Sequence, residues 1–435
     1  MRIAFFEDGL VSNLTPIALL RPVFELICGQ FSLRERFIRR FDISEWGALV
    51  RPQLVEVYKE EHPEAYLNDP QWLGRESTLL VNGRWLPTLE ALANINPGEA
   101  GILEDELVYL SIDSEEAILF QDSPWDDALL QLARARKQFK TSGRIIHHPW
   151  DLVNHNAEQL VADYRLRQYG WSQFEPGPQV AILGPIENVY IHPRASVDPF
   201  VVLDARTGPI SIDAGAVIQP FTRIEGPCHV GYDSQLFRAN VREGTTIGPT
   251  CRVGGEVEGS ILHGYVNKYH DGFLGHGYVC PWVNLGALTT NSDLKNDYSE
   301  VKVPLAGVST ETHSTKVGCF IGDHTKTALA SLFNTGSAIG VMCMVLPGGE
   351  LLPKHIPSFS RIWHGELDDG LNLEDGLQTA RTAMNRRNCE LTIAQERLIR
   401  QLHDESRQER QQAITRFQER KNRQSQVDMQ HSVAG

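Results

Sequence analysis

The sequence predicts an α/β domain over residues 1–175, a parallel β-helix over residues 176–365 and a charged helical segment with a frayed tail over residues 366–435. Three observations lead to this prediction. Short apolar runs first alternate with helix-like segments, aliphatic residues then recur at every sixth position, and apolar residues finally recur at every seventh position. A chain of 435 residues is long enough for two or three units with buried cores.

The first region alternates two kinds of segment. Residues 3–6 and 79–81 are apolar runs that suit buried strands, whereas residues 33–40 and 126–139 have helical patterns. Such alternation favours a mostly parallel sheet with helices on its faces. We therefore expect a Rossmann-like α/β domain.

The middle region carries a six-residue repeat. Its core is an unbroken series of aliphatic residues: Ile212, Ile218, Ile224, Val230 and Leu236. In a β-helix, each hexapeptide forms one short strand and one corner, with the aliphatic side chain pointing inward. The alternative is a β-sandwich, whose strands alternate apolar and polar residues over five or six positions. The segments here mostly lack that alternation, and a β-helix is the prediction.

The last region has helical character and many charges. Leu377, Met384, Leu391 and Leu398 are spaced by seven residues, which suits a helix that lays one narrow apolar stripe on a partner surface. The other positions that a coiled coil would need are polar. We expect this helix to pack on the body of the protein or on a sister subunit.

Composition and charge exclude several classes of protein. A net charge of −14 argues against nucleic-acid binding through a general positive field. No apolar stretch approaches the roughly 20 residues of a membrane-spanning helix, and the early acidic residues argue against a secretion signal. Seven cysteines without a Cys-x-x-Cys pair indicate neither a disulfide framework nor a zinc ribbon. We expect a cytoplasmic protein without a metal centre built from its own ligands.

Polar residues are concentrated in one part of the repeat region, at residues 267–298, where small corner residues are expected. Stacking of successive turns would bring His270 near Asn284 or Asn291, which would place a base beside amide partners. The other interpretation is that the asparagines form a ladder along the corners and that His270 is an exposed loop residue.

This stretch resembles the GlmU-like family, the bifunctional N-acetylglucosamine-1-phosphate uridyltransferases and glucosamine-1-phosphate acetyltransferases, and in particular a short, divergent bacterial branch of sugar nucleotidyltransferases. The resemblance covers roughly residues 1–365 and is strongest over residues 238–345. It implies a nucleotidyltransferase domain followed by a left-handed parallel β-helix. It also implies a homotrimer with acyl-coenzyme A sites between subunits.

The resemblance assigns roles to residues of the β-helix. Asn267-Lys268-Tyr269-His270 is similar to the family's histidine corner, which implies that His270 is the general base and Lys268 a substrate-binding residue. Residues 283–289 are similar to the family's Val-Asn-Ile-Gly-Ala-Gly-Thr segment. This implies that Asn284 contacts the sugar and that Gly286 and Ala287 offer backbone amides to acetyl-coenzyme A.

Two further roles follow from the same resemblance. Asn291 would orient His270, and Arg238 resembles the arginine that grips the phosphate of the sugar.

In the first region the resemblance implies a phosphate-binding arginine, for which Arg21 in Leu-Arg-Pro-Val-Phe-Glu-Leu is the candidate. Residues 79–84 look like the strand that normally ends in Gly-Asp, where the aspartate holds a catalytic Mg²⁺. Here Asn82 and Arg84 stand at its end, and we expect them to contact nucleotide phosphates. Mg²⁺ could still serve this domain. A plain turn is the alternative interpretation.

The resulting hypothesis is a sugar-1-phosphate nucleotidyltransferase fused to an acyl-coenzyme A-dependent acyltransferase. Its partners would be a sugar phosphate, a nucleoside triphosphate and acyl-coenzyme A, with no nucleic acid and no membrane. One alternative is a structural or regulatory β-helix protein whose sites have decayed. Another is a zinc enzyme that uses His263, His270 and His276, which would require the three side chains to converge.

Overall fold

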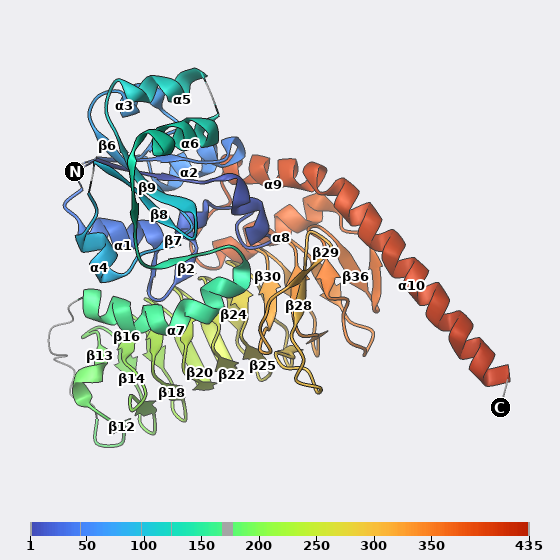
Figure 1. Cartoon of the computed structure of the whole chain (residues 1–435). Helices are drawn as coiled ribbons and strands as arrows, with labels where there is room; N and C mark the ends of the chain where they lie inside the picture. The colour runs from blue at the N-terminus through green and yellow to red at the C-terminus, as the bar shows by residue number, and fades with distance from the viewer. Residues whose placement is uncertain (1, 44, 97, 123, 168–176, 434–435) are drawn as a thin grey trace.

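The computed structural model describes residues 2–43, 45–96, 98–122, 124–167 and 177–433, for Asp122 and residues 424–433 the backbone only. The predicted boundary at residue 175 lies outside the described residues. Figure 1 shows an α/β domain above a stack of parallel coils, with a long helix running out from the body towards the C-terminus. Among the described residues, no helix is long and apolar enough to cross a membrane.

The amino-terminal domain is built on a seven-stranded sheet with strand order β10-β8-β9-β6-β1-β4-β5. Its centre is parallel, since β1 pairs in parallel with both β4 and β6, while β9 runs antiparallel to β6 and β8. The strands are β1 (Arg2–Phe6), β4 (Glu45–Leu49), β5 (Tyr66–Leu67), β6 (Thr78–Asn82), β8 (Glu99–Leu103), β9 (Glu106–Ile112) and β10 (Lys137–Lys140). The predicted α/β class is confirmed.

Helices and two small strand pairs complete this domain. β1 is buried along its whole length, as a central strand covered on both faces must be. The helices are α1 (Leu33–Arg40), α2 (Val55–Glu61), α3 (Pro70–Leu73), α4 (Leu89–Ala93), α5 (Leu119–Asp122), α6 (Trp125–Ala135) and α7 (Pro149–Leu166), and the small pairs are β2 (Ile27–Cys28) with β3 (Phe31–Ser32) and β7 (Trp85–Leu86) with β11 (Arg144–Ile145).

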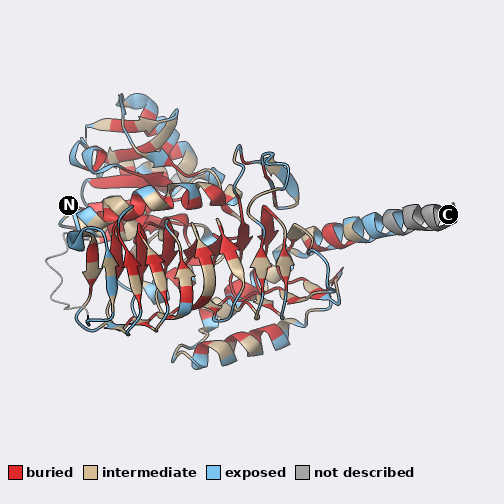
Figure 2. Cartoon of the chain, turned by 90° about the horizontal axis from the view of Figure 1, so that it is seen from below, coloured by how far each residue is buried: buried red, intermediate tan, exposed pale blue. Residues whose placement is uncertain are grey.

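The middle region is a parallel β-helix with three faces, as predicted. Ile212 pairs with Val230 on the next coil, so that one coil takes 18 residues here, or one hexapeptide per face. The five aliphatic residues of the six-residue series have no solvent exposure. Figure 2 shows buried residues along the strands and exposed residues at many of the turns. The repeat therefore works as the sequence indicated, with each aliphatic side chain filling the centre of the coil.

Strands of the first face lie against the amino-terminal domain and α7. They are β13 (Val189–Ile191), β16 (Ile210–Ile212), β19 (Cys228–Val230), β21 (Thr245–Ile247), β23 (Ile261–Leu262), β26 (Tyr278–Val279), β30 (Cys319–Ile321), β33 (Ser337–Ile339) and β35 (His355–Ile356). α7 crosses this face (Figure 1), and the Asn156 amide on α7 donates to the Gly244 carbonyl at 2.8 Å.

The second and third faces share two long strands, β20 (Gln235–Val241) and β22 (Arg252–Glu258), which bend round the corner between them. The second face also contains β14 (Ser196–Val197), β17 (Val217–Ile218), β24 (Asn267–Lys268), β31 (Lys326–Thr327), β34 (Met344–Leu346) and β36 (Arg361–Trp363), with β37 (Glu366–Asp368) antiparallel at its end. The third contains β12 (Ala181–Leu183), β15 (Val202–Asp204), β18 (Arg223–Glu225), β25 (Phe273–Gly275), β27 (Thr290–Asn291) and β32 (Leu332–Phe333). A hairpin of β28 (Lys302–Leu305) and β29 (Val308–Glu311) projects from the coils.

The carboxy-terminal region contains three helices where the sequence suggested one: α8 (Leu373–Asn385), α9 (Ile393–Glu405) and α10 (Arg407–Val433). The break after α8 has a local cause, because Asn388 has a left-handed φ of 57° and Thr392 starts α9 with a capping box. The predicted stripe is real, since Leu377 and Leu398 are buried in the core that includes the amino-terminal domain, Leu391 packs against that core, and Met384 is buried as well. The backbone of α10 is helical to Val433, where a frayed tail was expected.

Candidate active sites

The candidate acyl-transfer site lies on the corner between the second and third faces of the β-helix. His270 follows β24 and precedes β25, and its imidazole is exposed. Its ring lies 4.9 Å from that of Tyr269, in an edge-to-face arrangement. Tyr269 in turn contacts Phe237 at 4.1 Å between ring centroids. These rings connect the coil of His270 to the coil that carries Arg238.

Arg238 occupies the same corner as His270. It interrupts β20 where the register to β22 shifts, and it has a left-handed φ of 48°. Its side chain is exposed, with no carboxylate partner among the described residues. With coils about 5 Å apart, two coil steps place Arg238 roughly 10 Å along the corner from His270. An unpaired guanidinium at this position is available to an anion.

Ala287 belongs to the next coil at this corner. The Leu288 N–H donates to the carbonyl of Asp271 at 2.8 Å, which ties the segment of Ala287 directly to the loop of His270. The Ala287 carbonyl accepts from Ala330, but the Ala287 N–H donates to no acceptor among the described residues. The corner therefore presents a free backbone donor beside an exposed imidazole.

The close packing of two coils explains why position 286 is a glycine. A Cβ atom at this position would lie 2.6 Å from the backbone of Ala328 on the following coil, and its N–H donates to the Thr327 hydroxyl at 3.0 Å. Only glycine permits such a close approach. Gly286 thus sets the path of the backbone that carries the free N–H of Ala287.

Lys268 is buried beside this corner. Its ammonium donates to the carbonyls of Gly254 at 2.7 Å and His270 at 3.1 Å, and burial lowers its pKa to about 8. The lysine anchors the backbone of the histidine loop. In this arrangement it faces away from solvent, so a substrate would reach it only if these contacts opened.

Asn284 and Asn291 are separated by the corner. Asn284 forms a short side-chain hydrogen bond with Asn267 on the second face, as expected of an asparagine ladder. Asn291 is buried on the third face, where its amide accepts from the Gly275 N–H and donates to the Gly275 carbonyl, both at 2.9 Å. The amide of Asn291 therefore holds β25 in place and does not contact the His270 imidazole.

The three histidines of the zinc alternative occupy three different corners of one coil. His263 follows the first face and His270 the second, while His276 follows the third. His263 contacts the Glu25 carbonyl at 3.0 Å, and His276 pairs with Asp293 at 2.7 Å. In the described part of the chain no group of three metal-ligating residues comes together. The geometry does not support a zinc site built from these histidines.

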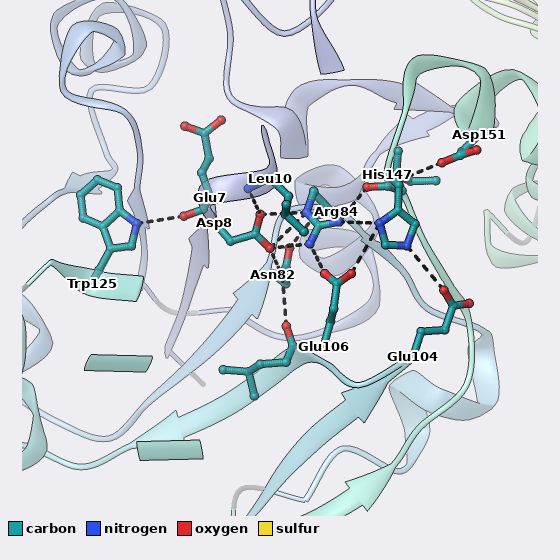
Figure 3. A network of polar contacts seen from close by, with 12 residues as sticks. Glu7, Asp8, Leu10, Asn82, Arg84, Glu104, Glu106, Trp125, His147 and Asp151 are labelled. Atoms are coloured by element: carbon teal, nitrogen blue, oxygen red, sulfur yellow. Dashed lines mark hydrogen bonds and ion pairs between the residues drawn. The ribbon is translucent and has the colours of Figure 1, made fainter. Parts of the chain in front are cut away.

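The second candidate site lies at the ends of β1 and β6 in the amino-terminal domain (Figure 3). Arg84 is almost fully buried there. Its guanidinium donates to both carboxylate oxygens of Asp8, with Nη2 to Oδ2 at 2.6 Å, and also to Glu106. The remaining Nη1 group donates to the Ile146 carbonyl at 3.0 Å and contacts His147 at 3.5 Å.

This network differs from the phosphate-binding role expected of Arg84. Each nitrogen of the guanidinium already has an acceptor, so a phosphate would have to displace Asp8 or Glu106. The Asn82 amide also donates to Asp8, at 2.8 Å. A Mg²⁺ ion does not fit this group either, because the Arg84 guanidinium already occupies oxygens of both carboxylates and would repel a second cation bound to the same oxygens.

Arg21, like Arg84, already has partners within the protein. Its guanidinium makes a two-pronged ion pair with Asp323 of the β-helix and donates to the Ile17 carbonyl at 2.9 Å. Arg21 therefore joins two parts of the molecule, and its expected role as a phosphate ligand is not supported by these contacts.

Reasoning from the sequence missed Asp8, Glu106 and the pair of His276 with Asp293. The two acids are distant from Arg84 in the chain. Asp293 lies two residues beyond the end of β27, and no spacing in the sequence indicated that its carboxylate would meet His276.

Residues 3–171 match the sequence model of the sugar nucleotidyl transferase family. Over 93 residues the chain is 31% identical to a bifunctional sugar-1-phosphate nucleotidylyltransferase/acetyltransferase of Sulfurisphaera tokodaii. The predicted resemblance to the GlmU-like family is confirmed. The match covers 21% of this chain and 23% of that relative, so only about a quarter of the relative's length is spanned.

Among solved structures, an Arabidopsis UDP-N-acetylglucosamine acyltransferase matches 48% of this chain and 78% of its own, with 17% identity and a TM-score of 0.25. The matched sequence family and the bifunctional relative of Sulfurisphaera tokodaii are both transferases, in agreement with the enzyme class predicted from the sequence.

Proposed function

We propose that this GlmU-like chain transfers an acyl group from acyl-coenzyme A, such as acetyl-coenzyme A, to the amino group of a sugar phosphate. The β-helix would carry this reaction, and the attached amino-terminal domain would bind a sugar nucleotide or its precursors. The observation that carries the proposal is the shared corner of Arg238, His270 and Ala287, since it brings together an anion-binding group, a base and a free amide donor.

Each residue has a defined chemical task in this reaction. The imidazole of His270 takes a proton from the attacking amine as its nitrogen forms a bond to the thioester carbonyl. The Ala287 N–H donates to the oxygen that becomes negative in the tetrahedral intermediate. The carbon–sulfur bond then breaks, the thiolate of coenzyme A leaves, and the proton held by His270 can neutralise it. Arg238 would hold the sugar phosphate through its guanidinium.

The experiment compares acylation of glucosamine-1-phosphate and related amino sugar phosphates by the full chain and its variants. His270→Ala should lower turnover roughly 10²- to 10⁴-fold, the usual range for a positioned general base, without weakening coenzyme binding. His313→Ala is the matched control, because His313 is an exposed histidine on another part of the β-helix. Acylation at the parental rate in His270→Ala would refute the assignment.

Homotrimer formation is part of the proposal. A row of exposed apolar side chains follows the corner that carries His270; it consists of Phe200, Phe221, Leu288 and Leu329, with exposures of 51%, 69%, 59% and 68%. The rings of Phe200 and Phe221 stack at 5.7 Å. Exposed apolar side chains on both sides of the coils of Arg238 and His270 favour contact with a second copy of the chain. The acyl-transfer site would then lie at the junction of subunits.

A second candidate function applies to the amino-terminal domain. Because Arg84 occupies oxygens of both Asp8 and Glu106, this domain is suited to bind a sugar nucleotide without transferring a nucleotidyl group. Pyrophosphate release from each nucleoside triphosphate and a sugar-1-phosphate, measured with and without Mg²⁺, separates the two functions. Rapid Mg²⁺-dependent release would favour a nucleotidyltransferase, and binding without release would favour a regulatory domain.

A further inference from the structure

A groove lined by cations lies between α10 and the end of the β-helix, away from both candidate active sites. Its volume is about 610 Å³. In Figure 1, α10 passes close to β28, β29 and β36 before it continues away from the body. The Arg416 guanidinium donates to the Gly307 carbonyl in the β28–β29 turn at 3.5 Å, and His355 pairs with Glu409 of α10 at 2.9 Å. These contacts fix the helix as one wall of the groove.

Both walls are positively charged. The helix wall carries three arginines at spacings of four and three residues, which places them on one side of α10, and the β-helix wall carries three lysines. These six cations, here called the basic groove, are Lys295, Lys302, Lys354, Arg416, Arg420 and Arg423. Glu419 is the one carboxylate among the described lining residues. This local surplus of positive charge contrasts with the net charge of −14 for the whole chain.

Most of these cations are bonded to neutral oxygens. Lys295 donates to the Ser299 hydroxyl and the Glu300 carbonyl, and Lys354 contacts the Thr335 hydroxyl at 3.5 Å. Arg420 donates to the carbonyl of Arg416. Lys302 pairs with Glu311, and Arg423 lies 3.6 Å from Glu419. Four of the six charges thus have no carboxylate within reach in the described structure.

The lysines also repel each other. Partial burial lowers the pKa of Lys354, and the nearby charge of Lys295 lowers it further. An anion placed between the two ammonium groups would offset this repulsion. Lysine offers a point charge to a phosphate and arginine a planar fork, so the two walls together could bind several phosphate oxygens.

We propose that the basic groove binds a small molecule carrying at least two phosphate groups. The volume suits one ligand of the size of a nucleotide or a coenzyme. His355 is the only aromatic ring in the described lining, so there is no platform for stacking successive bases, as a single-stranded nucleic acid would require. Recognition would therefore act on the phosphates. Pyrophosphate, a nucleoside triphosphate and coenzyme A all carry this chemistry.

The test uses calorimetric titration of the full chain with inorganic pyrophosphate, ATP, coenzyme A and inorganic phosphate. Pyrophosphate should bind, inorganic phosphate should bind more weakly, and affinity should fall as salt increases. Arg420→Gln and Lys354→Gln should each weaken binding about tenfold, the loss expected for one charge-assisted hydrogen bond. Arg407→Gln is the matched control, since Arg407 is an exposed arginine of α10 that pairs with Asp404 outside the groove.

The order of affinities identifies the natural source of the phosphates. Tighter binding of coenzyme A than of ATP would assign the groove to the acyl donor, and the reverse order would assign it to a nucleotide. The proposal fails if none of the polyphosphates binds at millimolar concentration, or if Arg407→Gln weakens binding as much as Arg420→Gln. A single-stranded oligonucleotide that binds far more tightly than pyrophosphate, with the same sensitivity to Arg420→Gln, would also overturn it.

Discussion

Arg21 and Asp323 are 302 residues apart in the chain, yet the guanidinium of the first grips both carboxylate oxygens of the second. Both side chains are largely buried, with 12% and 2% exposure. The pair lies where the amino-terminal domain meets the corner of the β-helix that carries His324. It therefore couples the position of one part of the molecule to the other.

Removal of Arg21 should weaken this junction. Arg21→Met leaves the Asp323 carboxylate buried without its partner, which costs about 3–5 kcal/mol in comparable buried pairs. Denaturant titration should show this loss of stability, and Arg21→Met/Asp323→Leu should recover part of it. The control is Arg39→Met, because Arg39 is exposed on α1 and only covers the Phe31 ring. Equal effects of the two single variants would contradict the role of the pair.

Replacement of Arg84 should likewise lower the stability of the protein, and this effect should be larger than any effect on ligand binding. Arg84→Met leaves Asp8 and Glu106 facing each other with reduced access to water, and a loss of about 3 kcal/mol is expected for the amino-terminal domain. Arg144→Met serves for comparison, since that arginine is half exposed and lies 3.9 Å from Glu158. Unchanged stability together with lost nucleotide affinity would instead support the phosphate-binding role expected from the sequence.

Acidification should loosen the junction between the domains. Burial, together with the charge of Arg21, lowers the pKa of His263 to about 3, and burial also lowers the pKa of His324. Both imidazoles stay neutral in the folded chain but take up a proton in the unfolded chain below pH 6.5. Stability should fall as the pH drops from 6.5 towards 4, by at most about 1.4 kcal/mol per pH unit for each histidine.

Thermal unfolding between pH 7.5 and 4.5 measures this slope. His263→Gln should make the pH dependence shallower, whereas His313→Gln should not, because His313 is 81% exposed. A slope that is the same in His263→Gln and the parent chain would show that this histidine does not carry the effect.

The apolar row beside His270 should control assembly. Phe221→Glu places a charge in the proposed contact between copies and should convert a trimer to monomers in light scattering at micromolar concentration. Ile118→Glu alters an apolar residue of the amino-terminal domain that is also more than half exposed, and it should leave the mass unchanged. A monomeric parent chain would remove the basis for a site shared between subunits.

Local periodicity explains why the β-helix was predictable. The series from Ile212 to Leu236 needs only its own spacing to specify three inward positions per coil, because each hexapeptide repeats the same strand and corner. The helical stripe of Leu377, Met384 and Leu398 was predictable for the same reason. The seven-residue spacing did not show that this segment forms separate helices. The division comes from the left-handed backbone of Asn388 and the capping box that Thr392 begins, and neither feature affects the spacing of apolar residues.

The candidate sites depended on longer-range contacts. From the stacking of coils, the sequence predicted that His270 would lie near Asn284 or Asn291, and it is the structure that places Ala287 on the coil next to the loop of His270. The sequence did not determine the contacts of Arg84, whose partners are Asp8, just after β1 and 76 residues away, and Glu106 of β9, 22 residues away. Nor did it determine the pairing of Arg21 with Asp323. Whether a charged side chain is free to bind a ligand depends on which opposite charges the fold brings to it, and only the tertiary structure decides that.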